Sequence, residues 1–377
     1  MKNKAAIIFV IVSIYWLSLN AQITNFKEKF ELPAQVSETS GLLLFKGKIL
    51  THNDSGDAAN LYEIDSLTGN LLRTITIQNA NHVDWEDIAE DDTHIYIGDF
   101  GNNNGNRTDL KIYKILKSDV ETKNSISAEQ ITFSYEDQTD FTSKPNNNNF
   151  DAEAMIVLDD FIFIFTKNWV DLTTNVYKIP KTANTYSAIK VSNANVQGLV
   201  TGATFYNNNI MLCGYDTSGI AFLVLINNLP ENSDDFFKND FEKYFLISEL
   251  GFGNQVEGIT AIGNEKFYIS REAVNNNGTI ISQKLFQFTD SRTGTLSTKQ
   301  YKETLVDIYP NPTKNVIKIQ SSDYIKETSL YSILGKNVMK VYRPKKELDI
   351  SNLQKGVYLL KITFDNGSQV TRKVIKL

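Results

Sequence analysis

The chain has 377 residues with 38 basic and 44 acidic side chains, so its formal net charge is −6. The charge is unevenly distributed: residues 302–377 hold 14 basic and 7 acidic residues, whereas residues 23–301 hold 22 basic and 37 acidic ones. The acidic middle argues against nucleic acid and anionic lipid as partners, because both require a positive protein surface. The single cysteine, Cys213, excludes an intramolecular disulfide, and three histidines make a histidine-based zinc site unfavourable.

The N-terminus is expected to be a secretory signal peptide spanning residues 1–21. Lys2 and Lys4 precede an unbroken apolar run over residues 5–19, and Ala21 supplies a small residue at the cleavage position. This run is shorter than the roughly 20 residues that a helix needs to cross a bilayer. It therefore predicts a cleaved export signal and a mature chain without a transmembrane anchor.

Residues 22–300 are predicted to form an all-β domain, a β-propeller. Helical periodicity is nearly absent, and short strands alternate with turns rich in Asn, Gly and Asp. A unit recurs in which a small or acidic pair precedes an aliphatic residue, and a second strand then ends in a polar cluster. The five visible onsets are Ser40-Gly41-Leu42, Glu86-Asp87-Ile88, Glu153-Ala154-Met155, Gly202-Ala203-Thr204 and Glu257-Gly258-Ile259. Repeats of ~40–50 residues with three or four strands are typical of propeller blades.

The propeller is expected to have six blades, with five or seven as alternatives. Dividing the repeat region by ~45 residues per blade gives about six. The long gap between Glu86 and Glu153 contains an extra strand at residues 130–135, which belongs either to a blade with a weakened onset or to an insertion. The strand at residues 26–32 is predicted to complete the last blade, which removes a free sheet edge.

Acidic residues at equivalent points of the repeats are candidate metal ligands. The candidates are Glu86, Glu153 and Glu257 at strand onsets, with Asp54 and Asp99 at the ends of second strands. The first strand of each propeller blade lines the central channel, so residues at its start converge at one mouth. Crowded carboxylates repel one another unless a cation neutralises them, and calcium prefers oxygen ligands. We therefore expect a Ca²⁺ site at the mouth; the alternative is that the onset residues hydrogen-bond the backbone of the neighbouring blade and bind no ligand.

Other residues at strand starts and ends are candidates for catalysis and ligand contact. Glu86 and Asp87 are candidate catalytic residues. Trp85 is either a stacking platform for a sugar or a core residue beneath the mouth. Lys167 and Arg271 either bind an anionic substrate or pair with the carboxylates.

The middle of the chain also resembles known propellers. Residues 84–89, 98–103 and 150–154 resemble a group of secreted bacterial propellers of unassigned function. More distantly, the Glu-Gly-Ile onset at Glu257 resembles the calcium-dependent propellers of the gluconolactonase/regucalcin and strictosidine-synthase type, and the esterase-like phytase propellers. The resemblance covers residues 35–290 and implies a propeller fold.

The C-terminal region, residues 301–377, is expected to be a separate small β-sandwich. Pro310 and Pro312 remove backbone donors after the first strand, and residues 365–368 predict a tight hairpin between two alternating strands. The motifs are Leu305-Val306-Asp307-Ile308-Tyr309-Pro310-Asn311-Pro312, residues 330–336, residues 349–353, residues 355–358 and a basic last strand at residues 372–377.

This series of motifs resembles the C-terminal sorting domain of the type IX secretion system. The resemblance implies that residues 305–377 contact the type IX secretion machinery. It also implies that the protein passes through the periplasm and becomes secreted or located on the outer cell surface. The alternative is an ordinary appended sandwich domain that binds sugar or protein.

Together these features predict an exported propeller that binds calcium and a small-molecule, glycan or protein ligand at an acidic channel mouth. Gly-x-Ser-x-Gly, His-Glu-x-x-His and Walker motifs are absent from the sequence. The enzymatic interpretation is therefore metal-assisted hydrolysis of a lactone or phosphoester, with Glu86, Asp87 or Glu257 activating water. The alternative is a non-catalytic cell-surface propeller that recognises glycan or protein through its loops.

Overall fold

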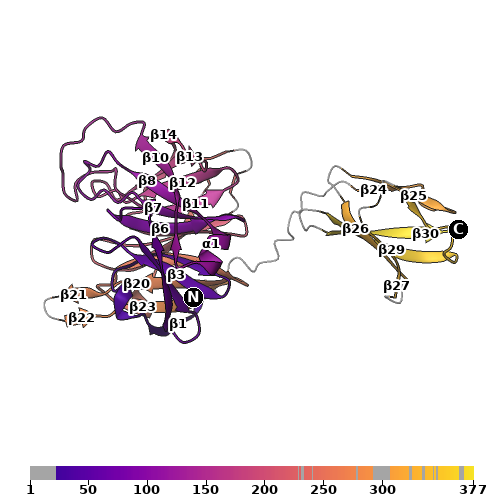
Figure 1. Ribbon diagram of the computed structural model, residues 1–377, viewed down its shortest axis with the longest axis horizontal. Helices are drawn as coiled ribbons and strands as arrows, with labels where there is room; N and C mark the ends of the chain where they lie inside the picture. The colour runs from indigo at the N-terminus through magenta and orange to yellow at the C-terminus, as the bar shows by residue number, and fades with distance from the viewer. Residues whose placement is uncertain are drawn as a thin grey trace, which may run out of the picture. The chain divides into compact units, whose positions relative to one another are not determined.

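The computed structural model divides the chain into two compact units, Met1–Thr295 and Leu296–Leu377 (Figure 1). The residues that the structure describes are 23–227, 229–230, 233–239, 241–276, 279–291, 306–321, 325–332, 336–342, 344, 347–364 and 369–377. The predicted signal peptide, residues 1–21, and the predicted hairpin turn, residues 365–368, lie outside them. Among the described residues, no helix is both long enough and apolar enough to span a membrane.

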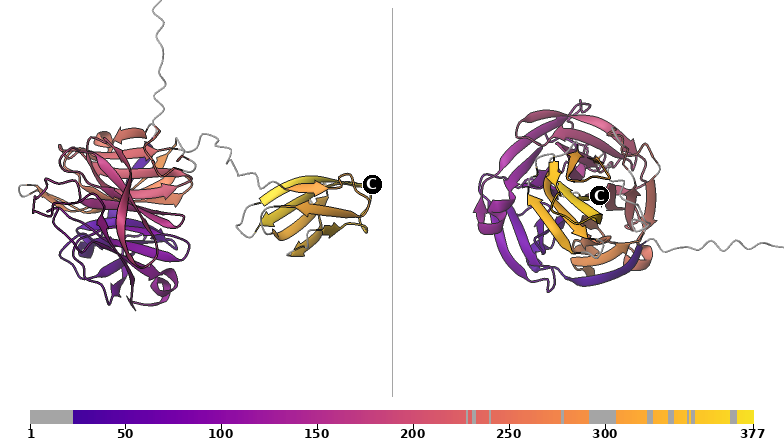
Figure 2. Two further views of the ribbon diagram at one scale, coloured as in Figure 1. Left: turned by 90° about the horizontal axis from the view of Figure 1, so that it is seen from above. Right: turned by 90° about the vertical axis from the view of Figure 1, so that its right-hand side faces the viewer.

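The N-terminal unit consists of groups of four antiparallel strands arranged in a ring, which Figure 2 shows end-on. The first strand of each group contacts the first strands of both neighbouring groups, so these inner strands form a closed circle. The inner strands are β2 (Thr39–Phe45), β6 (Trp85–Glu90), β11 (Ala152–Leu158), β15 (Leu199–Tyr206) and β19 (Val256–Gly263). A circle of four-stranded antiparallel units is the architecture of a β-propeller.

The remaining strands of each group pair outward from the inner strand. The second strands are β3 (Lys48–Asn53), β7 (His94–Asp99), β12 (Phe161–Thr166), β16 (Asn209–Tyr215) and β20 (Lys266–Arg271). The third strands are β4 (Asn60–Asp65), β8 (Lys111–Leu116), β13 (Thr174–Pro180), β17 (Ala221–Ile226) and β23 (Lys284–Asp290). The fourth strands are β5 (Leu71–Ile77), β10 (Glu129–Tyr135), β14 (Thr185–Ala194), β18 (Phe241–Phe245) and β1 (Ile23–Glu31).

The described residues contain five such groups, which was an alternative to the preferred six. The estimate from length counted long connections as if they formed a blade. Between β6 and β11 the chain forms the helix α1 (Lys117–Thr122), the short strand β9 (Ser125–Ile126) and a long loop at residues 136–151. The additional strand expected at residues 130–135 is β10, the fourth strand of the β6 group.

The N-terminal strand closes the ring, as predicted. β1 pairs antiparallel with β23, with Ile23 opposite Asp290. The ring of Phe26 stacks on that of Phe286 at a centroid distance of 5.5 Å. Because β1 comes from one end of this unit and β23 from the other, their pairing joins the two ends and covers a free edge.

A few elements lie outside this regular pattern. β10 pairs in parallel with β14, which joins the outer edges of two neighbouring groups, and β9 pairs in parallel with β5. The other elements are the 3₁₀ helix η1 (Ala34–Val36), the helix α2 (Ile247–Leu250) and the hairpin of β21 (Val274–Asn276) with β22 (Thr279–Ile281).

The hydrophobic core of this unit lies between neighbouring sheets. Leu50 and Ile75 of the β2 group pack in one cluster with Trp85 and Ile97 of the β6 group. Trp85 is fully buried there, so it takes the core position that was the alternative to a sugar platform. Cys213 is a buried free cysteine in the cluster between the β15 and β19 groups and acts as a small apolar residue.

The C-terminal unit has two sheets that share one core. One sheet has the order β24 (Asp307–Tyr309), β25 (Val316–Gln320) and β28 (Glu347–Asp349). The other has the order β27 (Asn337–Tyr342), β26 (Ile325–Ser332), β29 (Gly356–Phe364) and β30 (Gln369–Lys376). Ile317, Ile319 and Leu348 of the first sheet pack with Leu360 and Ile362 of the second.

Candidate metal centre

Each inner strand carries a β-bulge near its start. In β6, Trp85 pairs with Asp99 and Asp87 pairs with Gly98, so Glu86 is the extra residue without a cross-strand partner. The five bulge residues are Gly41, Glu86, Glu153, Thr201 and Glu257. A bulge bends the strand and redirects the side chain of the extra residue. Three of the five inner strands therefore begin with a redirected glutamate.

The bulges give a better alignment of the repeats than the sequence does. Ser40 and Gly202 were expected to be equivalent to the three glutamates, but the equivalent residues are Gly41 and Thr201. A bulge inserts one residue without changing the local residue pattern. Sequence patterns therefore leave a repeat free to shift by one position.

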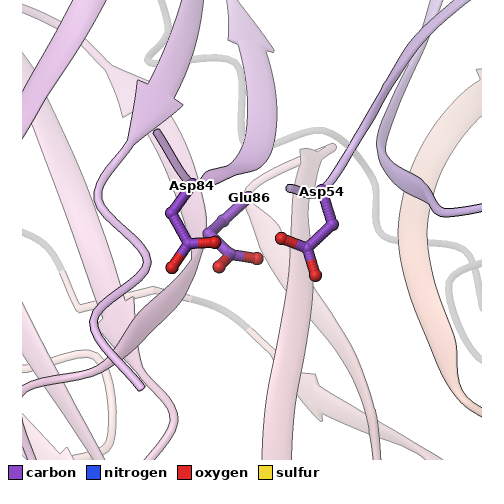
Figure 3. Close-up of side chains that lie close together, drawn as sticks. All are labelled: Asp54, Asp84 and Glu86. Atoms are coloured by element: carbon purple, nitrogen blue, oxygen red, sulfur yellow. The ribbon is translucent and has the colours of Figure 1, made fainter. Parts of the chain in front are cut away.

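Three carboxylates from two neighbouring groups form the acidic cluster, which we define as Asp54, Asp84 and Glu86. One carboxylate oxygen of each lies within 4.8 Å of the other two. Glu86 belongs to β6, Asp84 immediately precedes that strand, and Asp54 immediately follows β3 of the adjacent group. Figure 3 shows the three carboxylates directed toward one another.

Two buried oxygens of the acidic cluster lack hydrogen-bond partners. Glu86 is 2 % exposed, and its Oε1 has no hydrogen-bond partner; neither has the buried Oδ1 of Asp54. Burial and the neighbouring carboxylates hold the pKa values of Asp54 and Glu86 well above their usual range. Such crowding is unfavourable unless protons or a cation neutralise the carboxylates.

Backbone lies directly against the acidic cluster. A Cβ atom added to Gly101 would come within 2.0 Å of Glu86 Oε1 and 2.5 Å of Asp84 Oδ2. The Gly101 N–H donates to the carbonyl oxygen of Asp84 at 3.2 Å. The glycine thus lets the chain pass close to the carboxylates without displacing them.

Glu86 also lies close to a second group of acids. Carboxylate oxygens of Glu86, Asp151 and Glu153 lie within 4.8 Å of one another. Asp151 accepts hydrogen bonds from the Asn102 N–H at 2.6 Å and from Trp169 Nε1 at 2.8 Å. Burial raises the pKa of Asp151 to about 6. This second group therefore has partners that the acidic cluster lacks.

Lys167 is the main partner in the second group. Its Nζ lies 2.5 Å from Glu153 Oε1, and both side chains are buried. Burial opposes the charge of Lys167, yet the carboxylates around it, first Glu153, hold its pKa well above the usual range. Burial raises the pKa of Glu153 to about 8, although Lys167 opposes that shift.

Glu257 belongs neither to the acidic cluster nor to the second group of acids. Its carboxyl group is buried, and burial holds its pKa well above the usual range. Lys167 lowers that pKa and Glu272 raises it, so both charges act on Glu257. The three onset glutamates are thus equivalent in the fold, but only Glu86 and Glu153 have carboxylates in a common cluster.

Asp87 and Asp99 bond to the protein itself. Asp87 accepts hydrogen bonds from the N–H groups of Ile88 at 2.8 Å and of Met155, in the neighbouring group, at 2.7 Å. Asp99 accepts from Arg107 at 2.9 Å and from the Asp84 N–H at 3.1 Å. Asp87 therefore has the bonding between blades that was the alternative to ligand binding, while Asp99 supports the segment that carries Asp84.

Arg271 lies apart from the carboxylates at which it was expected. It donates from Nη1 to Asn254 Oδ1 at 2.6 Å and from Nη2 to the Ser282 carbonyl oxygen at 2.9 Å. The strand register gives Thr166 the position equivalent to Arg271, and Glu272 the position equivalent to Lys167. Lys167 and Arg271 were predicted to occupy equivalent positions in their groups. The register shows that these two positions differ by one residue.

Sequence reasoning missed two acids that the structure brings next to the predicted glutamates. Asp84 and Asp151 each stand two residues before a bulge glutamate, in the sequences Asp-Trp-Glu and Asp-Ala-Glu. A repeated Asp-x-Glu motif could have identified both. In each motif the aspartate immediately precedes an inner strand and the glutamate is the bulge residue of that strand.

The oxygen-rich acidic cluster fits a hard cation. Asp54, Asp84 and Glu86 supply only carboxylate oxygens, and calcium accepts six to eight such oxygen ligands in flexible geometry. The unpartnered oxygens of Asp54 and Glu86 are the atoms that a cation would satisfy. These three residues are therefore the ones that would hold the metal.

The ring of four-stranded groups describes a propeller-like protein, and the C-terminal unit indicates how it leaves the cell. Residues 307–377 match the Secretion system C-terminal sorting domain family. The chain is therefore exported through the type IX secretion system to the cell surface or exterior, as the sequence motifs predicted. This match concerns the C-terminal unit alone.

A curated relative is similar over a short part of the chain. Beta-agarase D of Zobellia galactanivorans is 33% identical over 70 residues, which is 19% of this chain and 14% of that protein. The chain thus spans far less than two thirds of that relative. The activity in the name of that relative therefore cannot be transferred to the propeller-like unit of this chain.

Solved structures with similar folds are distant. The PQQ-bound aldose sugar dehydrogenase from Streptomyces coelicolor has 11% identity and a TM-score of 0.39, covering 70% of this chain and 97% of that chain. Exo-beta-1,3-galactanase from Phanerochaete chrysosporium has 9% identity and a TM-score of 0.47, covering 93% and 94%. PorZ of Porphyromonas gingivalis, a surface component of the type IX secretion system, has 12% identity and a TM-score of 0.35, covering 90% and 45%. Likenesses at this level carry no argument about activity.

Proposed function

We propose that the protein is an exported five-bladed propeller that binds calcium, and next to it a ligand, at its acidic mouth. The observation that carries the proposal is the acidic cluster, in which three carboxylates converge and two buried oxygens lack partners. The described residues place no basic side chain in an ion pair with Asp54, Asp84 or Glu86. A bound cation would supply the missing charge and the missing bonds.

The enzymatic form of this proposal is hydrolysis of an ester-type substrate. Bound calcium would polarise a carbonyl or phosphoryl oxygen of the substrate. Glu257 is the best candidate for handling a proton, because its buried carboxyl group has a raised pKa and belongs to neither acidic group. Asp87 is unsuited, since both its oxygens accept backbone hydrogen bonds. The excess of carboxylates favours an uncharged lactone over a phosphoester, because it repels a phosphate group.

The non-catalytic alternative is recognition of glycan or protein through the loops. Phe252 is 66% exposed and Val170 is 60% exposed, and both lie in loops rather than in strands. Exposed aromatic and aliphatic side chains in loops suit a protein or sugar surface. Loss of ligand binding on changing these loops, with no effect of changing Glu257, would favour this alternative.

Calcium titration of the chain tests the proposed function. We expect calcium to release or absorb heat in calorimetry and to raise the melting temperature of the wild type. Asp54→Asn, Asp84→Asn and Glu86→Gln each remove one ligand charge and should weaken calcium binding at least tenfold, about 1.4 kcal/mol. Asp92→Asn is the matched control, because it removes an exposed acid elsewhere on the same group of strands. A wild type that shows neither heat nor a melting shift would exclude the calcium site.

A further inference from the structure

The second group of acids is as closely spaced as the acidic cluster requires for a metal ion, but it already contains a positive charge. Glu86 belongs to both groups, and in each the three carboxylate oxygens lie within 4.8 Å of one another. The difference is Lys167, whose Nζ lies 2.5 Å from Glu153 Oε1. In one set Lys167 is paired with Glu153, while in the other Asp54 Oδ1 has no hydrogen-bond partner; the unpartnered Glu86 Oε1 belongs to both sets.

Lys167 is held in place from several directions. Its Nζ lies 5.0 Å from the ring centroid of Trp169 and 5.3 Å from that of Tyr215. The backbone N–H of Lys167 donates to the carbonyl oxygen of Asp151 at 2.7 Å. Only 7% of its side chain is exposed. An ammonium group fixed between two aromatic rings and a carboxylate is well placed to remain there when a ligand enters the mouth.

We propose that Lys167 is a built-in counter-ion that takes the place of a second metal ion and so limits the mouth to one calcium ion. This inference rests on the proposed calcium function. The carboxylates of Glu86, Asp151 and Glu153 would otherwise present the same kind of oxygen site as the acidic cluster. With Lys167 present, a second divalent cation would meet an ammonium group inside that site and be repelled.

The proposal also gives Lys167 a different function from the one expected. Lys167 was a candidate for binding an anionic substrate, but its charge is directed to Glu153 and shielded by Trp169 and Tyr215. It is a positioning residue whose ammonium group stays paired with the carboxyl group of Glu153. With one bound ion, the metal could polarise a substrate oxygen as a Lewis acid. A two-metal site, which clamps the attacking and leaving oxygens in some hydrolases, would not form.

Counting bound calcium tests the proposal. Equilibrium dialysis of the full chain against saturating calcium should give one ion per wild-type chain and two per Lys167→Gln chain. The double variant Lys167→Gln with Glu153→Gln removes both charges and should return the count to one. Lys178→Gln is the matched control: Lys178 also pairs with a carboxylate, Asp234 at 2.6 Å, and lies over an aromatic ring, but its partners are not those of the mouth. It should bind one ion.

The outcomes separate this inference from the proposed function. A wild type that binds no calcium excludes both, whereas one ion on the wild type and one on Lys167→Gln overturns the inference alone. Two ions on the wild type would also overturn it. Lys167→Gln leaves Glu153 without its partner, so its melting temperature should be low without calcium and should rise more than that of the wild type when calcium is added. Failure of this variant to fold in millimolar calcium would show that a metal ion cannot replace the lysine.

Discussion

Glu86 and Asp87 are adjacent, buried and acidic, yet they serve different purposes in the ring. Glu86 is the extra residue of a bulge, and its Oε1 lacks a partner beside the acidic cluster. Asp87 follows the bulge, resumes the strand pairing, and bonds across to the backbone of Met155 in the next group. A single inserted residue therefore separates a candidate metal ligand from a residue that joins two blades.

Asp87→Asn should destabilise the fold without changing calcium binding. The amide supplies one oxygen acceptor and one NH₂ donor, so a backbone N–H group of Ile88 or Met155 would lose its acceptor. Leaving a buried donor without a partner costs about 1–3 kcal/mol. Urea unfolding measures the loss, and Asp92→Asn should stay within about 0.5 kcal/mol of wild type. Unchanged stability with lost calcium binding would contradict the assignment of Asp87 to the contact between blades.

Among the strands, β1 has a special role, because it closes the ring. β1 pairs with β23 from the other end of the unit, and Ile23 and Phe26 of β1 pack in the cluster that contains Phe286 and Phe288. Without β1, the outer edge of β23 would expose unpaired backbone groups and apolar side chains. The closing strand therefore contributes both stability and protection against edge-to-edge association.

Removal of residues 22–31 should destabilise the ring and promote association. Removing one buried and one partly buried apolar side chain, Ile23 and Phe26, should cost about 2–5 kcal/mol. Thermal melting and size-exclusion chromatography measure the two effects. Lys27→Gln on the same strand is the control, because its side chain is exposed and its backbone pairing is retained. A truncated chain that stays monomeric with an unchanged melting temperature would show that β1 is not needed for closure.

At the scale of the whole molecule, charge is divided between the two units. The C-terminal region is basic, whereas the propeller-like region is acidic and concentrates several of its carboxylates at the mouth. Burial raises the pKa of Asp151 to about 6 and that of Glu272 to about 7. The folded ring thus holds protons that the unfolded chain releases, and its stability depends on pH and on cations.

Stability in calcium-free buffer should fall as the pH rises from 5 to 8. A carboxyl group with a raised pKa in the folded state stabilises the fold while it is protonated. This stabilisation is complete below the unfolded-state pKa, near 4, and is lost as the pH rises through the folded-state pKa. For Asp151 alone, the loss is at most about 3 kcal/mol. Melting temperatures at pH 5, 6.5 and 8 measure it. Added calcium should restore more stability at pH 8 than at pH 5, because the carboxylates are then ionised; a melting temperature that rises with pH without calcium would contradict the prediction.

Much of the fold could be predicted because its signals are local. Turn residues and alternating strands indicated an all-β chain, and the aliphatic onsets marked five inner strands. Six blades were preferred over the alternative of five because the segment between β6 and β11 is long, although it forms no further blade. Of the acids that the structure brings together, Glu86, Glu153 and Asp54 were predicted as candidate metal ligands, whereas Asp84 and Asp151 were not, because they lie before the repeated onsets. Glu257 and Asp99, which were also predicted, lie outside both groups of acids.

The sequence by itself determined the strand content, the export destination and the presence of equivalent glutamates, because each depends on short contiguous patterns. Only the tertiary structure decided which carboxylates meet. Asp54 reaches Asp84 and Glu86 because the β2 and β6 groups are neighbours in the ring, and Glu153 meets Lys167 because β11 and β12 pair. Ring closure and bulge register set these distances, and both arise from pairing between residues far apart in the chain.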